Sequence, residues 1–137
     1  MTKNDLIMLV TTTSQDVSVN SVIPLTTITR RRGCALANTV SNTIIASKPG
    51  YYSVKGTVTF TAPVAGNATI SLVKNNIPVE GVTASETITT ATTEVRTVPV
   101  SGIVRVSCNE VNVPFNLTVS GIAITVSNAE LDFTYLG

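Results

Sequence analysis

The chain has 137 residues, of which 43% are hydrophobic, only 4% aromatic and 12% charged, with a net charge of +1. That length corresponds to one domain, large enough to bury a core without a disulfide or a metal. So small a net charge does not suit nucleic acid and gives no attraction to an anionic membrane. The absence of histidine removes the residue that most often performs acid–base catalysis.

The beginning of the chain contains a short apolar run, residues 6–10. This run is too short for a signal-peptide core or a membrane span, so we expect synthesis in the cytoplasm. Residues 1–15 are expected to be an N-terminal arm that docks on a partner, a strand added to a sheet edge, or a frayed end. Residues 16–137 are expected to form the folded domain.

Apolar and polar residues alternate in short runs along the rest of the chain, which predicts strands with one buried face. In the clearest run, residues 51–61, one face collects Tyr52, Val54, Val58 and Phe60. No window shows helical periodicity. In chain order the predicted strands cover residues 16–23, 34–38, 42–46, 51–61, 68–74, 77–82, 93–100, 103–108, 115–119, 122–126 and 129–136.

Turn-forming residues separate these runs. Asn75-Asn76 suits a two-residue hairpin, because asparagine tolerates a positive φ. About ten short strands at this spacing predict an all-β protein, a two-sheet jelly-roll sandwich. Within it, Leu131, Phe133 and Tyr135 share one face by parity.

The densest charge is the run Arg30, Arg31 and Arg32, which we predict to lie in a loop, residues 29–33. This loop is either simply solvated or docks on an acidic surface, since guanidinium groups bind carboxylates bidentately. No aromatic residue interleaves the arginines, so stacking on nucleic-acid bases is not expected.

Catalytic and metal sites are not expected. Without histidine no Ser-His-Asp or Cys-His arrangement can be drawn. Cys34 and Cys108 lie 74 positions apart, outside the usual spacings of zinc ligands. Glu130 and Asp132 alternate on one strand face and are a poor calcium site, more simply explained as a wet face. We therefore predict a non-enzyme with no cofactor and no metal.

The two cysteines are expected to be reduced and buried, because no secretory signal is recognised. A disulfide between Cys34 and Cys108 stays open as the alternative, if the mature protein functions outside the cell.

Several motifs resemble the tumour-necrosis-factor-like (TNF-like) jelly roll, the fold of the globular heads of complement collagens. The resemblance covers about residues 17–137 and fits the bacterial and phage branch best, including the C-terminal domains of collagen-like spore-surface proteins of bacilli. The motifs lie at residues 17–25, 42–45, 50–54 (GYYSV), 65–66, 70–76 (ISLVKNN) and 129–137 (AELDFTYLG).

The resemblance implies a homotrimer, and small stand-alone members look like virion proteins of tailed phages. It implies a capsid decoration or head-fibre protein located on the virion, with other virion proteins as partners at local three-fold positions of a capsid. At the subunit interface we expect the outlying Tyr51 and Tyr135, with Leu136, because tyrosine combines an apolar ring with a polar tip.

Two alternatives stay open. One is a receptor-binding tip of a phage tail or neck fibre that recognises host cell-surface carbohydrate; the scarcity of aromatic residues weighs against it. The other is a bacterial surface or spore-layer protein, which would usually show a collagen-like stalk or a targeting segment.

Overall fold

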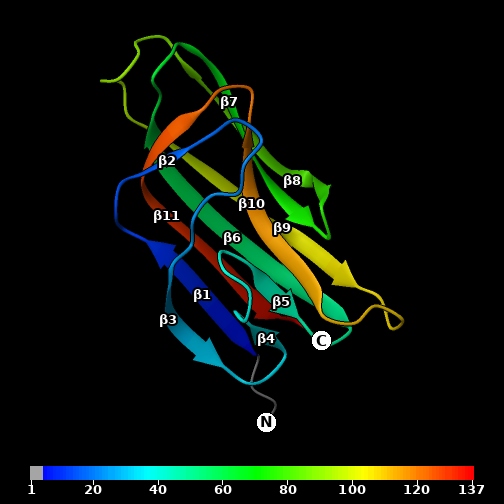
Figure 1. The fold of residues 1–137 in the computed structure, drawn as a ribbon. Coiled ribbons are helices and arrows are strands. Elements are labelled where there is room, and N and C mark those ends of the chain that lie inside the picture. Colours follow the sequence, from blue (N-terminus) through cyan, green and yellow to red (C-terminus); the bar gives the residue numbers. More distant parts are fainter. Residues whose placement is uncertain (1–4) are drawn as a thin grey trace.

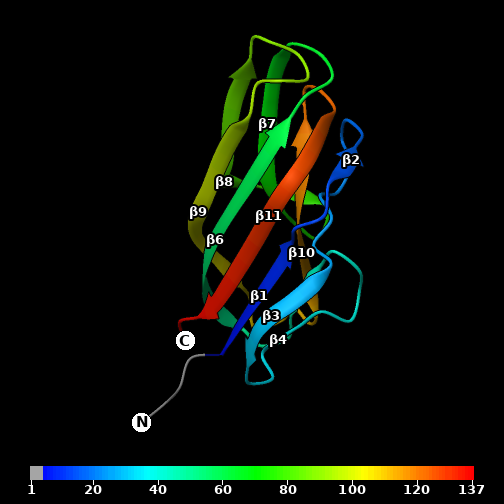
Figure 2. The same ribbon diagram turned by 90° about the vertical axis from the view of Figure 1, so that its left-hand side faces the viewer.

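The computed structural model describes residues 5–137, which form strands and no helix (Figure 1). Two antiparallel sheets pack face to face, which confirms the predicted all-β sandwich (Figure 2). The strands are β1 (Leu6–Thr11), β2 (Gln15–Val17), β3 (Thr27–Arg32), β4 (Leu36–Ala37), β5 (Ile44–Ala46), β6 (Gly50–Thr61), β7 (Gly66–Lys74), β8 (Ile77–Ile88), β9 (Arg96–Val106), β10 (Val113–Ser120) and β11 (Ile124–Tyr135).

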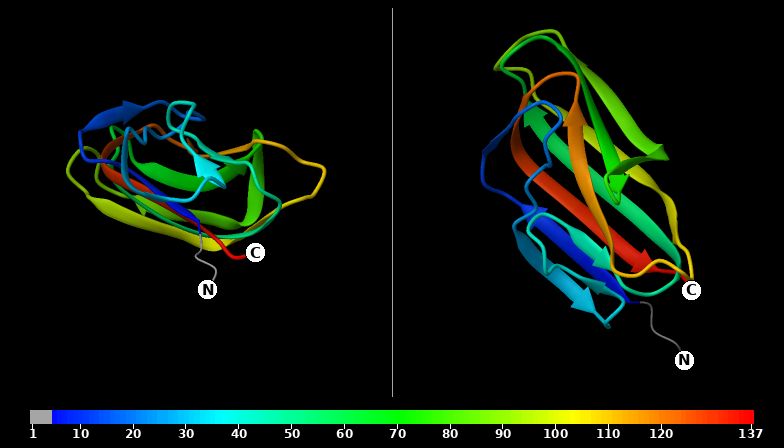
Figure 3. Two further views of the ribbon diagram at one scale, coloured as in Figure 1. Left: turned by 90° about the horizontal axis from the view of Figure 1, so that it is seen from below. Right: turned by 45° about the vertical axis from the view of Figure 1, so that its right-hand side comes forward.

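The larger sheet, sheet A, has the order β3-β1-β11-β6-β9, and β2 pairs with part of β11. The smaller sheet, sheet B, has the order β4-β5-β10-β7-β8. The left-hand view of Figure 3, from below, shows the two sheets as two layers. No helix among the described residues is long and apolar enough to span a membrane.

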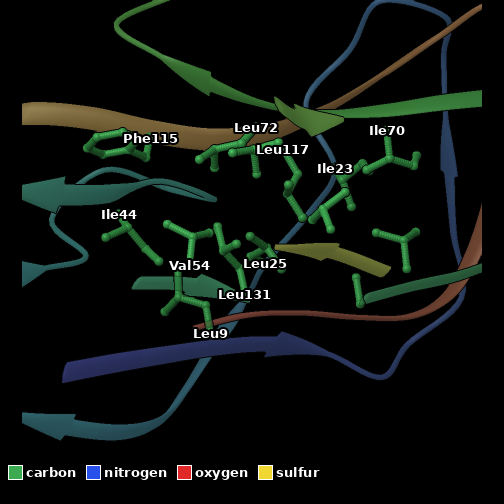
Figure 4. Packing of buried hydrophobic residues seen from close by; sticks show 14 of the residues in the cluster. Leu9, Ile23, Leu25, Ile44, Val54, Ile70, Leu72, Phe115, Leu117 and Leu131 are labelled. Carbon is green, nitrogen blue, oxygen red and sulfur yellow. The ribbon is translucent and has the colours of Figure 1, made fainter. Parts of the chain in front are cut away.

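The core consists mainly of aliphatic side chains that the period-two alternation of both sheets turns inward. Ile70, Leu72 and Leu117 of sheet B face side chains of sheet A (Figure 4). Aromatic rings fill one end of the sandwich, where Phe115 and Phe133 lie 4.9 Å apart between centroids and join the two sheets. The four apolar residues that share one face of β6 are buried, and so are Leu131 and Phe133 of β11, which shows that both sets fill the core.

The hairpin between β7 and β8 turns at the predicted residues. Asn75 and Asn76 have φ angles of 52° and 69°, so both central residues of the turn adopt the left-handed region. This is the backbone of a two-residue turn whose twist matches that of the flanking strands.

Two predicted strand breaks are absent. Residues 93–108 contain one continuous strand, β9, and residues 122–136 contain one strand, β11, with a bulge between Val126 and Asn128. Gly102 lies in β9 between the two strands predicted there, and it is a packing position: a Cβ on Gly102 would lie 2.7 Å from Val82 Cγ2 of β8. Glycine is therefore needed there for the close approach of two sheets and not for a turn.

Other boundaries differ from the prediction. The strand expected at residues 16–23 is reduced to β2 and an isolated bridge between Val22 and Thr118. In contrast, β8 continues to Ile88 through a threonine-rich stretch without a clear signal. Its odd and even side chains are mostly exposed or half-buried because β8 is the edge of sheet B.

The expected N-terminal arm contains an integral strand. β1 lies between β11 and β3, and its inward side chains Ile7 and Leu9 are completely buried. The division expected at residue 15 therefore does not follow the fold. Of the three alternatives, residues 6–11 are neither an arm nor a frayed end; they form an added strand, which is covered by β3 and so is not the edge of the sheet. Residues 1–4 of the expected arm lie outside the described residues.

The position of β1 predicts that Leu9→Ala lowers the free energy of unfolding by about 2–5 kcal/mol, the cost of a cavity at a buried leucine. Chemical denaturation followed by circular dichroism measures this value. Val19→Ala is the control, because Val19 is exposed, and its cost is expected to stay below about 1 kcal/mol. Equal small effects of both substitutions would contradict the placement of β1 in the core.

Burial of Tyr52 predicts a distinctive alkaline titration. The ring is fully buried, and burial raises the pKa of its hydroxyl to about 12. The hydroxyl donates to the Lys48 carbonyl at 2.5 Å. Because the unfolded chain deprotonates near pH 10, Tyr52 favours unfolding increasingly as the pH rises from about 10 to about 12. Absorbance of tyrosinate against pH should show one tyrosine that ionises last, and Tyr52→Phe should abolish that step. A step that persists in this variant would contradict the assignment.

Candidate interaction surface

The outer face of sheet A follows from the strand register. Directly opposed residues of antiparallel strands point to the same side of a sheet, so the partners of one outward residue are also outward. This face is seen head-on in Figure 2. Its central part consists of Leu6, Met8, Val10, Ser53, Lys55, Thr57, Ile103, Glu130, Asp132 and Thr134.

The three arginines lie in a strand and not in the predicted loop. They belong to β3, the edge of sheet A, in which every residue is exposed. Arg30 is opposite Met8 and Arg32 is opposite Leu6, which places both on the outer face, whereas Arg31 is opposite the inward Ile7. The loop prediction was wrong because an edge strand exposed on both sides has no apolar alternation to reveal it.

Asp132 occupies the middle of this face, between Met8 of β1 and Lys55 of β6. Its Oδ1 is buried and has no hydrogen-bond partner among residues 5–137. Burial is the main cause that raises the pKa of this carboxyl; the neighbouring Glu130 adds to the rise, and Lys55 opposes it. Rotation of the carboxylate about χ2 would bring this oxygen to the surface without breaking a hydrogen bond of Oδ1, and it could then accept from a molecule that covers the face.

A hollow of about 220 Å³ opens beside this carboxylate. Side chains of three neighbouring strands line it, including Met8, Arg30 and Asp132. Arg30, which the sequence suggested for docking, thus lies in the same hollow as Asp132, one of the two carboxylates considered for calcium. The apolar side chains of β1 line the hollow with them. Among the described residues, no group of three or more His, Cys, Asp or Glu could hold a metal ion.

An apolar patch lies at one end of the same face. The Leu136 amide donates to the Tyr51 carbonyl at 2.8 Å, and the register places Ile103 on the same side of β9 as the Tyr51 side chain on β6. Tyr51 is 49% exposed, Leu136 48% and Ile103 63%. Two of the three predicted interface residues are therefore neighbours, and Ile103 joins them although sequence parity alone did not suggest it.

Tyr135, the third predicted interface residue, is turned the other way. Its ring packs on Tyr52 with centroids 5.0 Å apart, its hydroxyl donates to the Pro49 carbonyl at 2.7 Å, and Lys48 Nζ lies 4.7 Å from the ring centroid. This half-buried ring closes the end of the core. Gly50 lies beneath it with φ 137°, where a Cβ would lie 2.8 Å from the tyrosine hydroxyl.

The cysteines differ from the prediction. Cys34 follows β3 and Cys108 follows β9, and both are exposed and free. Both cysteines lie outside the strands, so the alternation of inward and outward side chains does not turn either of them into the core.

Comparisons with solved structures identify the architecture. The chain matches a crystal structure of murine APRIL with a TM-score of 0.66 and 14% identity, over 98% of this chain and 100% of that one. It matches Eiger TNF from S. frugiperda with a TM-score of 0.72 and 9% identity, over 98% and 92% of the two chains. The globular domain of zebrafish complement 1qA protein gives a TM-score of 0.67 and 7% identity, over 96% of both chains.

Sequence comparisons give no further relatives: no protein-family model and no curated protein matches the chain. Identities of 7–14% establish similarity of fold and not of activity. The strand order of both sheets and the coverage of nearly the whole chain nevertheless agree with the resemblance seen in the motifs. The chain has the TNF-like jelly-roll fold.

Proposed function

We propose that this protein forms a homotrimer and is a non-enzymatic structural protein of a phage particle, a capsid decoration or head-fibre protein. The main support for the trimer is the composition of the outer face of sheet A. It combines the apolar patch of Tyr51, Ile103 and Leu136 with a buried carboxylate oxygen that lacks a donor. Such a surface gains both apolar burial and a hydrogen bond when another chain covers it.

The partner on this face is a second copy of the chain. A ring of three is favoured by the motifs that resemble TNF-like jelly rolls, and it matches the local three-fold positions of a capsid. In a cyclic trimer the contact is heterologous, so the outer face of one subunit meets a different surface of the next. A low charge content, 12% of the residues, leaves little repulsion between copies.

The action proposed is mechanical. A trimer that binds only the assembled lattice stabilises the particle by mass action and needs no chemistry of its own. The absence of histidine agrees with a binding role. Virion proteins are the expected partners, and the virion is the expected location.

The edge strand β3 is the part proposed to dock on the capsid. Its exposed arginines extend from the edge of the sheet, where guanidinium groups can bind carboxylates of an acidic partner bidentately. Charged residues on an edge also oppose unwanted pairing with other strands. Side chains, and not backbone pairing, would therefore make this contact.

The trimer proposal predicts that Ile103→Glu shifts the protein to monomers, because it places a charge in the apolar patch. Sedimentation velocity measures the shift. Ile77→Glu is the matched control: Ile77 is 69% exposed, close to the 63% of Ile103, but lies on sheet B. Ile77→Glu should unfold at nearly the wild-type temperature, whereas Ile103→Glu loses the stabilisation that subunit association provides, so its circular dichroism spectrum checks that it keeps the β fold. Equal sedimentation of the two variants would contradict an interface on sheet A.

The docking proposal predicts that the double variant Arg30→Ser, Arg31→Ser is retained at least about tenfold less on capsids of the encoding virus, since each of the two charged contacts contributes about 1 kcal/mol or more and a tenfold change corresponds to about 1.4 kcal/mol. Co-sedimentation with capsids that lack the protein measures retention, and sedimentation velocity checks that the double variant is still a trimer, because Arg30 also lines the hollow on the outer face of sheet A. The control is the double variant Thr83→Glu, Ser85→Glu, at exposed positions of sheet B. It changes the net charge by the same amount as the arginine variant and should be retained like the wild type. Retention of the wild type on host cell walls and not on capsids would overturn the decoration proposal.

A further inference from the structure

A second concave site lies on sheet B, on the side of the sandwich away from the proposed subunit interface. It is a hollow of about 420 Å³, within the range of small-ligand pockets. The floor is the outer side of β10, one wall is the end of β7 with the turn into β8, and the other wall is formed by Asn20 and Val22. The lining residues are Asn20, Val22, Ser71, Val73, Asn76, Pro78, Asn116, Thr118, Val119 and Ser120.

None of the residues that line this hollow is ionisable. Its polar groups are amides and hydroxyls, each of which can both donate and accept a hydrogen bond. A charged ligand would find no opposite charge here, and a purely apolar ligand would bury these polar groups without partners. The adjacent charged side chains, Lys74 and Glu110, are 3.1 Å apart and neutralise each other.

The polar side chains of the hollow are mostly unused in the protein itself. Elsewhere on the outer side of sheet B, hydroxyls are paired across β7 and β8, as in Thr69 with Ser85 at 2.8 Å. Within the described part of the chain, no such side-chain hydrogen bond is made by Asn20, Asn76, Asn116, Thr118 or Ser120. The concave part of this face therefore carries the unpaired donors and acceptors.

Asn116 stands out among these side chains. Its Oδ1 is buried and has no hydrogen-bond donor among residues 5–137. Its amide can rotate about χ2 to meet a ligand without breaking a hydrogen bond of that oxygen. A ligand hydroxyl that donates to it removes the cost of a buried acceptor without a partner.

The walls exclude strand addition as the mode of binding. The backbone N–H of Asn20 donates to the Val119 carbonyl at 2.8 Å, and the backbone N–H of Ile23 donates to the Leu117 carbonyl at 2.8 Å. The backbone of β10 beside the hollow is thus already paired with the segment 20–23, and no free edge is offered to an extended peptide. Recognition has to come from the side chains.

We infer that this hollow is a binding site for neutral carbohydrate. Sugar hydroxyls donate and accept like the amides and hydroxyls of the floor, and the aliphatic faces of Val22 and Pro78 can cover the C–H groups of a sugar ring. The site is separate from the outer face of sheet A, so it adds a ligand to the proposed structural role and does not depend on it.

The test uses an array of neutral and acidic oligosaccharides together with isolated host cell-wall polysaccharide, to distinguish a free sugar from a polymer. The wild-type protein is expected to bind a neutral glycan either on the array or in the cell-wall polysaccharide. Thr118→Val removes one hydroxyl without changing shape, and should weaken binding about three- to tenfold, the effect of one lost hydrogen bond. Asn116→Leu should weaken it at least as much while leaving the fold intact, because it removes a buried oxygen without a donor.

Ser85→Ala is the matched control, since Ser85 is a hydroxyl residue on the same side of sheet B but outside the hollow. It should bind like the wild type, and thermal unfolding checks that all variants are folded. The inference is overturned if no neutral glycan binds in either arm at about 10 mM, well above the millimolar affinity of weak ligands. It is also overturned if binding survives both Thr118→Val and Asn116→Leu, or is confined to acidic glycans.

Discussion

The pairing of β6 with β11 is the interaction on which the rest of the structure depends. It runs from Tyr52 opposite Tyr135 to Thr61 opposite Thr125 and joins the middle of the chain to its C-terminal end. Because register fixes which side of a strand faces inward, this one pairing turns Phe133 into the core and Asp132 out of it. A slip by one residue would exchange the core with the outer face of sheet A.

The two outer faces of the sandwich differ in chemistry, and the proposed roles follow that difference. Sheet A presents apolar side chains, arginines at its edge and a carboxylate oxygen without a donor, a combination that suits a protein partner. Sheet B presents serine, threonine and asparagine: hydroxyls are paired across β7 and β8, whereas Asn116, Thr118 and Ser120 of the hollow make no side-chain hydrogen bond with the described residues. One face can thus be covered by neighbouring subunits while the other remains accessible to a ligand.

The parts of the fold that could be predicted from sequence are those in which burial alternates strictly. Residues 51–61 and the turn at Asn75-Asn76 follow directly from such local signals. β1 and β3 do not, since β1 presents five consecutive apolar residues and β3 has no buried side at all. The partners of a residue across strands are invisible to local pattern, so the meeting of Asp132 with Met8 and Lys55, and of Ile103 with the Tyr51 end of the face, required the register.

The mass of the wild-type protein in solution tests the central claim that copies of this chain cover the outer face of sheet A. Light scattering behind a size-exclusion column gives this mass without assumptions about shape. A homotrimer has a mass of about 43 kDa, three times the chain mass of 14.3 kDa, and this is the value expected. A mass of one chain that persists at high protein concentration would contradict it, and would leave the outer face of sheet A without its proposed partner.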